Sequence, residues 1–357
     1  MKSFEHAIKS FLAICFVLLQ GGNIYAQDQS VADSLVKIYQ KGQHTGTVKL
    51  DLLRNLAFNE VNDLKLSLSY AEELISLSNL EGNDLYLHRG YLQKGNVNRI
   101  FGNFDIALDA YFRSGEAATK AGYIEGQGAA YTAIADIYSL TGNATNAENY
   151  YDKAIQLLRK TNDSITLATV LLNTGDFYFH NKKYEAALAF FEEAGPIFKN
   201  TNYLIGTAYY LGNTGMVHAR QDKVVLAEAN LNEAVTILEE LGVYDPVCEY
   251  LIYLSDIYLK QQDINKAIST AKRSLELAIT YGMKDRISTA NLQLSTLYEQ
   301  LGNRAEAFKY YRNHIAYRDS VNNIKSVQQI ADLRTNYEIS QKQNEVDLLE
   351  KESELQD

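Results

Sequence analysis

The feature that most constrains this chain is a repeat of forty residues. A small side chain recurs at that spacing without insertion or deletion, at Ser67, Ala107, Ala147, Ala187, Ala227, Ala267 and Ala307. A second phase of the same period holds only Gly or Asn, at Gly42, Gly82, Gly122, Asn162, Asn202, Gly242, Gly282 and Asn322. These two residue types adopt a left-handed backbone most easily, so we expect each of them to end a helix. A period of this length predicts stacked units, each of which buries its apolar face only against its neighbours.

Each repeat has the pattern of two helices joined by a turn. Between residues 128 and 162, apolar side chains recur every three or four positions up to Tyr138, stop at Gly142 and then resume. Most repeats also place a bulky side chain, such as Tyr111, in the second helix, and a small residue, such as Gly95, in the first helix, where we expect the two helices to cross. A large ring opposite a small residue lets two helices approach closely. The sequence therefore predicts an all-α fold, a solenoid of helix-turn-helix units.

These spacings resemble those of the tetratricopeptide repeat (TPR) family. The two best copies begin at residues 128 and 168, and their matching positions are Ala135, Tyr138, Gly142, Ala147, Tyr151 and Ala154, then Gly175, Tyr178, Tyr184, Ala187, Phe191 and Ala194. The period is longer than the usual repeat of about 34 residues, the chain has no Trp, and the copies at Val48 and Cys248 are degenerate. The resemblance implies a right-handed TPR-type solenoid with seven repeats in residues 48–320.

The first 26 residues have the pattern of a secretory signal peptide. Two lysines precede an apolar run at residues 11–19, and Ala26 offers a small residue for cleavage before Gln27. Nine apolar residues are too few to cross a bilayer, so a permanent anchor is disfavoured. We therefore expect an exported protein of the periplasm or cell envelope. Residues 27–47 are then predicted to form a helix that caps the N-terminal end of the stack.

The segment at residues 321–357 differs from the repeats because it lacks Gly and Pro and keeps a heptad-like phase over Ile330 and Tyr337. Two interpretations stay open: a helix that caps the stack, or a coiled coil that weakly pairs two copies as a homodimer. An exported TPR stack followed by such a helix also resembles the sensor region of bacterial envelope signalling proteins, where the helix leads to a histidine kinase, a cyclase or a DNA-binding domain. That resemblance implies a sensor or adaptor for a membrane signalling partner, with the output domain absent from this sequence.

Patterns typical of catalysis are not found. The sequence contains no phosphate-binding glycine loop, no HExxH and no CxxC. We expect His218 to be packed and hydrogen-bonded, and Cys248, the one cysteine left after export, to be a buried thiol. Removal of residues 1–26 takes the formal net charge from −10 to −11, and an acidic chain without a basic stripe is a poor nucleic-acid binder. We predict no enzyme activity, no catalytic residue, no cofactor and no metal.

The resemblance implies instead a concave groove, lined by the first helix of each repeat, that binds a peptide or protein. The positions that face the groove in the family are occupied here by Arg89, Leu92, Asn96, Arg99, Asp136, Asn173, Asp176, His180, Tyr209, Asn213, Met216, Arg220, Tyr253, Asp256 and Lys260. Asn amides in such places can pair with both the N–H and the C=O of an extended peptide, and we expect Asn173 and Asn213 to point into water in the free protein. The alternative function is a structural scaffold or assembly factor in a periplasmic or surface complex.

Overall fold

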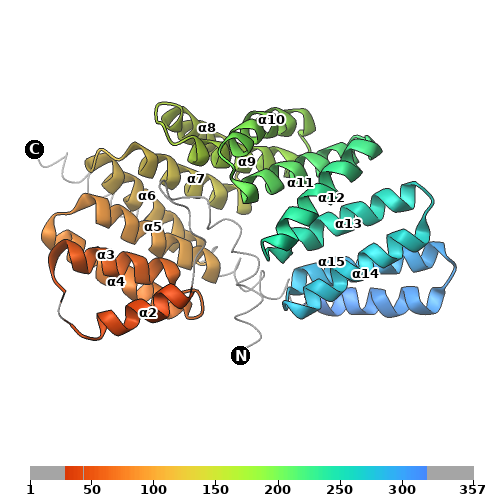
Figure 1. The fold of residues 1–357 in the computed structure, drawn as a ribbon, viewed down its shortest axis with the longest axis horizontal. Helices are drawn as coiled ribbons and strands as arrows, with labels where there is room; N and C mark the ends of the chain where they lie inside the picture. Colours follow the sequence, from red (N-terminus) through yellow and green to blue (C-terminus); the bar gives the residue numbers. More distant parts are fainter. Residues whose placement is uncertain (1–28, 43, 320–357) are drawn as a thin grey trace, which may run out of the picture.

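A computed structural model of the chain describes residues 29–42 and 44–319 (Figure 1), and these residues form helices and short turns only. The helices are α2 (Gln29–Tyr39), α3 (Gly46–Asn59), α4 (Leu64–Glu81), α5 (Asp84–Phe101), α6 (Phe104–Lys120), α7 (Ile124–Leu140), α8 (Ala144–Leu158), α9 (Ser164–His180), α10 (Tyr184–Asn200), α11 (Leu204–Arg220), α12 (Val224–Glu240), α13 (Tyr244–Lys260), α14 (Ile264–Thr280) and α15 (Lys284–Gln300). Residues 304–319 are also helical. The predicted all-α class is confirmed.

Two predictions concern other parts of the chain. The signal peptide at residues 1–26 and the capping helix or coiled coil at residues 321–357 lie outside the described residues.

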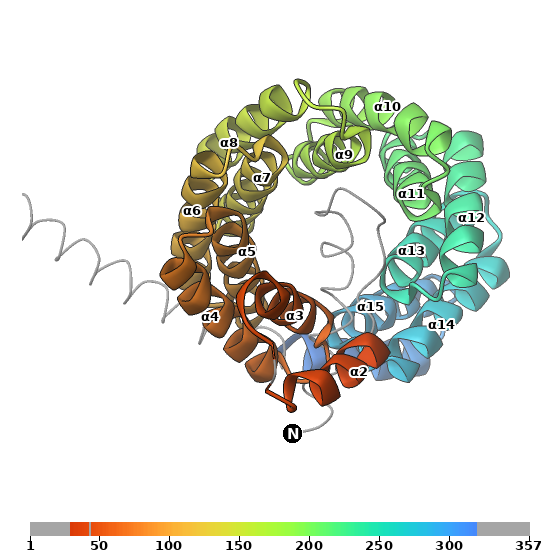
Figure 2. The same cartoon turned by 60° about the vertical axis from the view of Figure 1, so that its left-hand side comes forward.

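The helices pack in pairs into a TPR-like solenoid. From α3 onward each helix contacts the next along the chain, and α3, α5, α7, α9, α11, α13 and α15 also contact one another in turn. Figure 2 shows these first helices on the inner side of a curved stack and the second helices, such as α6, α10 and α12, on the outer side. We call the inner side of the stack the concave surface. It is lined by the first helices α3, α5, α7, α9, α11, α13 and α15. Helix α2 packs against α3 at the N-terminal end.

Left-handed residues end most of the second helices, as the sequence predicts. Positive φ angles are found at Gly42, Gly82, Gly122, Asn202, Gly242 and Gly282. The prediction is wrong for Asn162, which has no positive φ, because α8 already ends at Leu158 with the right-handed Arg159 as its C-cap. The Thr161 hydroxyl donates to the Leu158 carbonyl at 2.9 Å and accepts from the Asp163 amide at 3.2 Å, so no left-handed residue is needed there.

A second series of left-handed residues lies midway between these, in the turn inside each unit. It consists of Gly102, Gly142, Lys182, Asp222, Gln262 and Gly302, with φ between 56° and 78°. Most helices from α6 to α15 therefore have 17 residues and begin every twenty residues. The forty-residue repeat is thus built from two helices of equal length.

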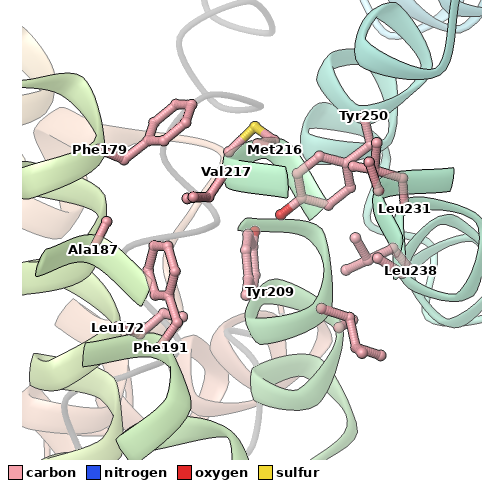
Figure 3. Close-up of a cluster of buried hydrophobic side chains, with 14 of the residues drawn as sticks. Leu172, Phe179, Ala187, Phe191, Tyr209, Met216, Val217, Leu231, Leu238 and Tyr250 are labelled. Atoms are coloured by element: carbon pink, nitrogen blue, oxygen red, sulfur yellow. The ribbon is translucent and has the colours of Figure 1, made fainter. Parts of the chain in front are cut away.

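The core is formed where a ring fills the space left by a small residue. A methyl group on Gly95 would lie 2.4 Å from the ring of Tyr111, and one on Gly175 would lie 2.4 Å from the ring of Phe191. Contacts this short cannot exist, so these glycines are required by the close approach of two helices. The largest cluster of buried side chains runs from α7 to α15, and Figure 3 shows part of it around Phe191. The predicted pairing of large and small residues is confirmed.

Candidate functional site

Two of the predicted concave residues are acceptors for tyrosine hydroxyls of the core. The hydroxyl of Tyr111 donates to Asn96 Oδ1 at 2.9 Å, and the hydroxyl of Tyr151 donates to Asp136 Oδ1 at 2.6 Å. Both bonds join the first and second helices of one unit at the same phase of the repeat. Burial raises the pKa of Asp136, an effect opposed by the charge of Arg99 and by the tyrosine bond. The side chains of Asn96 and Asp136 therefore join the two helices of their own units.

Asn213 also has an internal partner, so the expectation that it points into water is wrong. It is buried, and its Oδ1 accepts a hydrogen bond of 2.9 Å from the hydroxyl of Tyr250 on α13. The neighbouring Gly212 makes this possible, since a methyl group there would lie 2.1 Å from the Tyr250 ring. Three other predicted concave residues are buried in the core, namely Leu92, Tyr209 and Met216.

Asp176 differs from Asn96 and Asp136 because the facing position of its second helix does not hold a tyrosine. The second helix carries Phe191 at the position of Tyr111 and Tyr151, so the carboxylate is left for another partner. Its Oδ2 lies 3.3 Å from Nδ1 of His180, one turn along α9. The bond to Asp176 raises the pKa of His180 to about 9. The structure thus places a protonated imidazole beside a carboxylate on the exposed concave surface.

Four predicted residues meet at a pocket of about 140 Å³ between α11 and α13: Arg220, Tyr253, Asp256 and Lys260. The remaining lining is apolar and consists of Ala219, Ile257 and Leu259. Arg220 Nη2 donates to the Tyr253 hydroxyl at 3.1 Å, and its Cζ lies 5.0 Å from the centre of the Tyr253 ring. The ring of Phe179 on α9 approaches Tyr253 with 6.5 Å between centroids. We call this the α11–α13 pocket.

The charged side chains of the α11–α13 pocket differ in the partners that they have within the protein. Asp256 Oδ1 accepts from Gln293 Nε2 at 2.6 Å, and burial raises the pKa of Asp256. Lys260 pairs with Asp222 outside the pocket. Within residues 29–42 and 44–319, no carboxylate lies within ion-pair distance of Arg220. The guanidinium of Arg220 can therefore donate hydrogen bonds to a carboxylate or a carbonyl group of a ligand.

Sequence reasoning missed the apolar lining of this pocket. Ala219 and Leu259 lie forty residues apart, at the same phase as Phe179. Each of these residues directly precedes one of the predicted residues His180, Arg220 and Lys260. The forty-residue period could therefore have identified the apolar lining. The lack of an ion pair at Arg220 among the described residues could not have been identified in this way, because it depends on which carboxylates the fold brings near.

The other predicted concave residues are spread along the stack. Asn173 is half-buried, and its amide has no hydrogen-bond partner among the described residues. Arg89 lies over the ring of Tyr86, with its Cζ 5.1 Å from the ring centre. Arg99 is half-buried on α5, and its charge acts on Asp136. The fold therefore brings the predicted residues to one side of the stack and does not gather them at one point.

The buried thiol expected at Cys248 is confirmed, since the residue is 1% exposed and burial raises its pKa to about 12. The hydrogen bond expected for His218 is not found, because its buried Nδ1 has no partner among the described residues. The same part of the chain holds no group of three or more His, Cys, Asp or Glu residues arranged for a metal ion. No helix in it combines the length and the apolar composition that crossing a bilayer requires.

Two parts of the chain match the tetratricopeptide repeat family. One family model matches residues 126–200 and again residues 166–240, and a second matches residues 288–315. No curated protein matches the sequence.

Several solved structures have a similar fold. A Rap protein complexed with competence and sporulation factor is 13% identical, with a TM-score of 0.63 over 83% of this chain and 82% of that one. BtubC from P. vanneervenii is 20% identical, with a TM-score of 0.52 over 60% and 91%. A STAND signal-transduction ATPase with a tetratricopeptide repeat sensor, from Pyrococcus horikoshii, is 14% identical, with a TM-score of 0.60 over 85% and 50%. At these identities the likeness is one of fold.

Proposed function

We propose that the concave surface of this chain binds an extended segment of a partner protein. The matches to the tetratricopeptide repeat family over residues 126–240 and 288–315 support this proposal. The observation that carries the proposal is the α11–α13 pocket, where an aromatic ring, apolar side chains and Arg220, which has no carboxylate partner among the described residues, share one cavity. A pocket of this kind suits one apolar side chain of the ligand, and Arg220 suits a carbonyl or carboxylate beside it. The similar Rap structure holds competence and sporulation factor, so a fold of this kind can accommodate a bound factor.

We place this binding in the cell envelope, as the first 26 residues predict, and assign the protein the role of a sensor or adaptor in signal transduction. The partner segment would occupy the concave surface, and a membrane signalling protein would respond to whether the stack is bound or free. The proposed role is binding and includes no catalytic step.

A structural scaffold is the second candidate, and one observation favours it. On the last described helix, residues 304–319, Phe308 is 67% exposed and Tyr311 is 48% exposed. The earlier second helices bury the residue at the phase of Tyr311, for example Tyr111, Tyr151 and Phe191. An apolar helix face of this kind is typical of a contact within an assembly.

The two candidates can be separated with a photo-reactive amino acid placed at single positions in the full chain in cells. Position 219 lies in the α11–α13 pocket, position 232 on the outer side of α12, and position 308 on the last helix. We expect cross-linked partner peptides from position 219, with position 232 as the negative control. Cross-links from position 308 alone would contradict groove binding and support the scaffold.

A further inference from the structure

Asp256 shares the α11–α13 pocket with Arg220, yet the described residues include no ion pair between the two. Their charges do act on each other. Burial raises the pKa of Asp256, and the positive charge of Arg220 is among the effects that oppose this rise. Opposite charges attract strongly in a partly buried place. The position of the Asp256 carboxylate, away from the guanidinium, therefore needs a physical cause.

Asp256 has no hydroxyl donor in its own unit. Asp136, at the same phase of the repeat, accepts a hydrogen bond from Tyr151 in the second helix of its unit. The residue that corresponds to Tyr151 in α14 is Ala271, which has no hydroxyl. Asp256 therefore depends on a neighbouring unit for its hydrogen bond.

The donor comes from Gln293 on α15. Its Nε2 donates to Asp256 Oδ1 at 2.6 Å and to the hydroxyl oxygen of Ser255 at 3.2 Å. The hydroxyl of Ser255 donates its own proton to the Ala267 carbonyl at 2.9 Å, so it can only accept from Gln293. Two acceptors thus fix the orientation of the amide, with its nitrogen towards Asp256.

We propose that Gln293 is a positioning residue, which holds Asp256 away from Arg220 and so keeps the guanidinium open to a ligand. The amide is neutral, so it bonds to the carboxylate without adding a second positive charge to the pocket. Lys260, one turn beyond Asp256 on α13, is paired with Asp222. Gln293 does not line the pocket and acts through Asp256. This inference rests on the proposed function and names the residue that keeps its pocket available.

The positioning role can be tested first in the free protein by NMR. Gln293→Met keeps the length of the side chain and removes the amide. We expect Asp256 to pair with Arg220 in this variant and to shift the Arg220 Nε–Hε signal, which is assigned with Arg220→Lys. Addition of Asp256→Asn removes the negative charge and should return the signal towards its original position. An Arg220 signal that is unchanged in Gln293→Met would overturn the proposal, and so would a change confined to the signals of Lys260.

Gln93 on α5 provides a matched control, because it occupies the same phase of the repeat as Gln293. Its Nε2 also reaches the preceding unit, where it donates to the Ala57 carbonyl at 2.8 Å and to the Ser67 hydroxyl at 3.1 Å. Gln93→Met therefore removes hydrogen bonds between units without releasing a carboxylate. We expect it to leave the Arg220 signal unchanged. Equal shifts in the two variants would indicate a general loosening of the stack and would overturn the positioning role.

A second experiment follows binding through the photo-reactive residue at position 219 of the full chain in cells. We expect Gln293→Met to lower the yield of cross-linked partner peptide roughly two- to tenfold, because the ligand then has to displace an ion pair. Addition of Asp256→Asn should restore part of the yield, and Gln93→Met should leave it unchanged. A loss that Asp256→Asn does not reverse would contradict the proposal. Thermal unfolding, followed by circular dichroism, shows whether each variant is folded.

The outcomes separate this inference from the proposed function. If the Arg220 signal shifts in Gln293→Met and position 219 gives no cross-link in the unchanged protein, groove binding is wrong and the positioning of Asp256 stands. If position 219 gives equal yields with and without Gln293→Met, the positioning role is wrong and groove binding stands.

Discussion

Tyrosine hydroxyls decide which polar residues of the concave surface are free to bind a ligand. Where the core has Tyr111, Tyr151 or Tyr250, the facing Asn or Asp accepts its hydrogen bond. Where the core has Phe191, the facing Asp176 turns to the exposed His180 instead. A single oxygen atom in the core therefore changes the chemistry of the concave surface.

The bond from Tyr250 to Asn213 predicts a stability effect. Replacing Asn213 with Ala should lower the free energy of unfolding by about 1–3 kcal/mol, because the buried Tyr250 hydroxyl loses its acceptor. Asn173→Ala, at a half-buried amide without a partner, is the matched control and should change stability little. Urea denaturation followed by circular dichroism measures both. Equal midpoints for the two variants would argue against the internal bond.

The pair of Asp176 and His180 predicts a titration. The pKa of His180 should be about 9, and Asp176→Asn should bring it down towards the usual value for His. Since the folded pKa is raised, the stabilisation is full below the unfolded pKa of about 6.5 and is lost as the pH rises through about 9. The effect on stability should be small, because the His180 side chain is 62% exposed. NMR titration of the His180 ring protons gives the pKa, and a value that is the same in both proteins would show that no pair forms.

At the scale of single elements, the short turns set the length of every helix. From α6 to α15 each turn except the one between α8 and α9 has three residues, and one of them is left-handed, which satisfies the last carbonyl groups of the preceding helix. Glycine occupies most of these places, yet Lys182, Asp222 and Gln262 are left-handed without it. Non-glycine residues adopt this conformation at a cost of about 1–2 kcal/mol, so these three turns are strained by the neighbouring helices.

The turns predict changes of opposite sign. Gly122→Val should lower the free energy of unfolding by about 1–2 kcal/mol, because a β-branched residue resists positive φ. Lys182→Gly should raise the free energy of unfolding by up to about 1 kcal/mol. The backbone strain is removed, and the larger conformational entropy that Gly gives the unfolded chain offsets only part of this gain. Glu240→Ala, an exposed change at the end of α12, is the control. Thermal melts rank the three variants, and a destabilised Lys182→Gly protein would show that the turn is not strained.

At the scale of the whole molecule, most contacts run between neighbouring units. Each helix meets the next one along the chain, and each first helix meets the next first helix. The approach of Phe179 to Tyr253 from α9 to α13 is an exception among the described residues. The stack therefore depends little on the number of its units.

Deletions test this arrangement. Removal of residues 168–207 joins α9 to α11 in register and should leave a soluble helical protein. Removal of residues 168–187 joins a first helix to a second helix, so two second helices follow each other and the apolar faces no longer match. Circular dichroism and size-exclusion chromatography compare the two products. A compact protein from the shorter deletion would contradict the stack.

Export predicts the start of the mature chain. N-terminal sequencing of the protein recovered from the cell envelope should begin at Gln27, because the apolar run at residues 11–19 is followed by Ala26. A chain that begins at Met1 would remove the basis for the proposed location and leave the binding proposal intact.

The sequence by itself determined the helical units, their forty-residue period and most of the residues that end the second helices. Local chemistry suffices for these, because Gly and Asn enter the left-handed region easily and apolar spacing reports the buried face of a helix. The pairing of Tyr111 with Gly95 also follows from the sequence, because a bulky and a small residue recur at these two places in most repeats. These properties depend on residues within one unit or on the period itself.

Only the tertiary structure decided which concave residues are available. Asn213 was predicted to face water and is buried, because Tyr250, 37 residues further along the chain, reaches it across the next unit. Arg220 and Tyr253 become one pocket because α11 and α13 lie side by side. Tyr86 joins α5 to α3 through Asp51, and its ring also supports Arg89. Burial and pairing depend on distances between units, and those distances are set by how closely the helices pack.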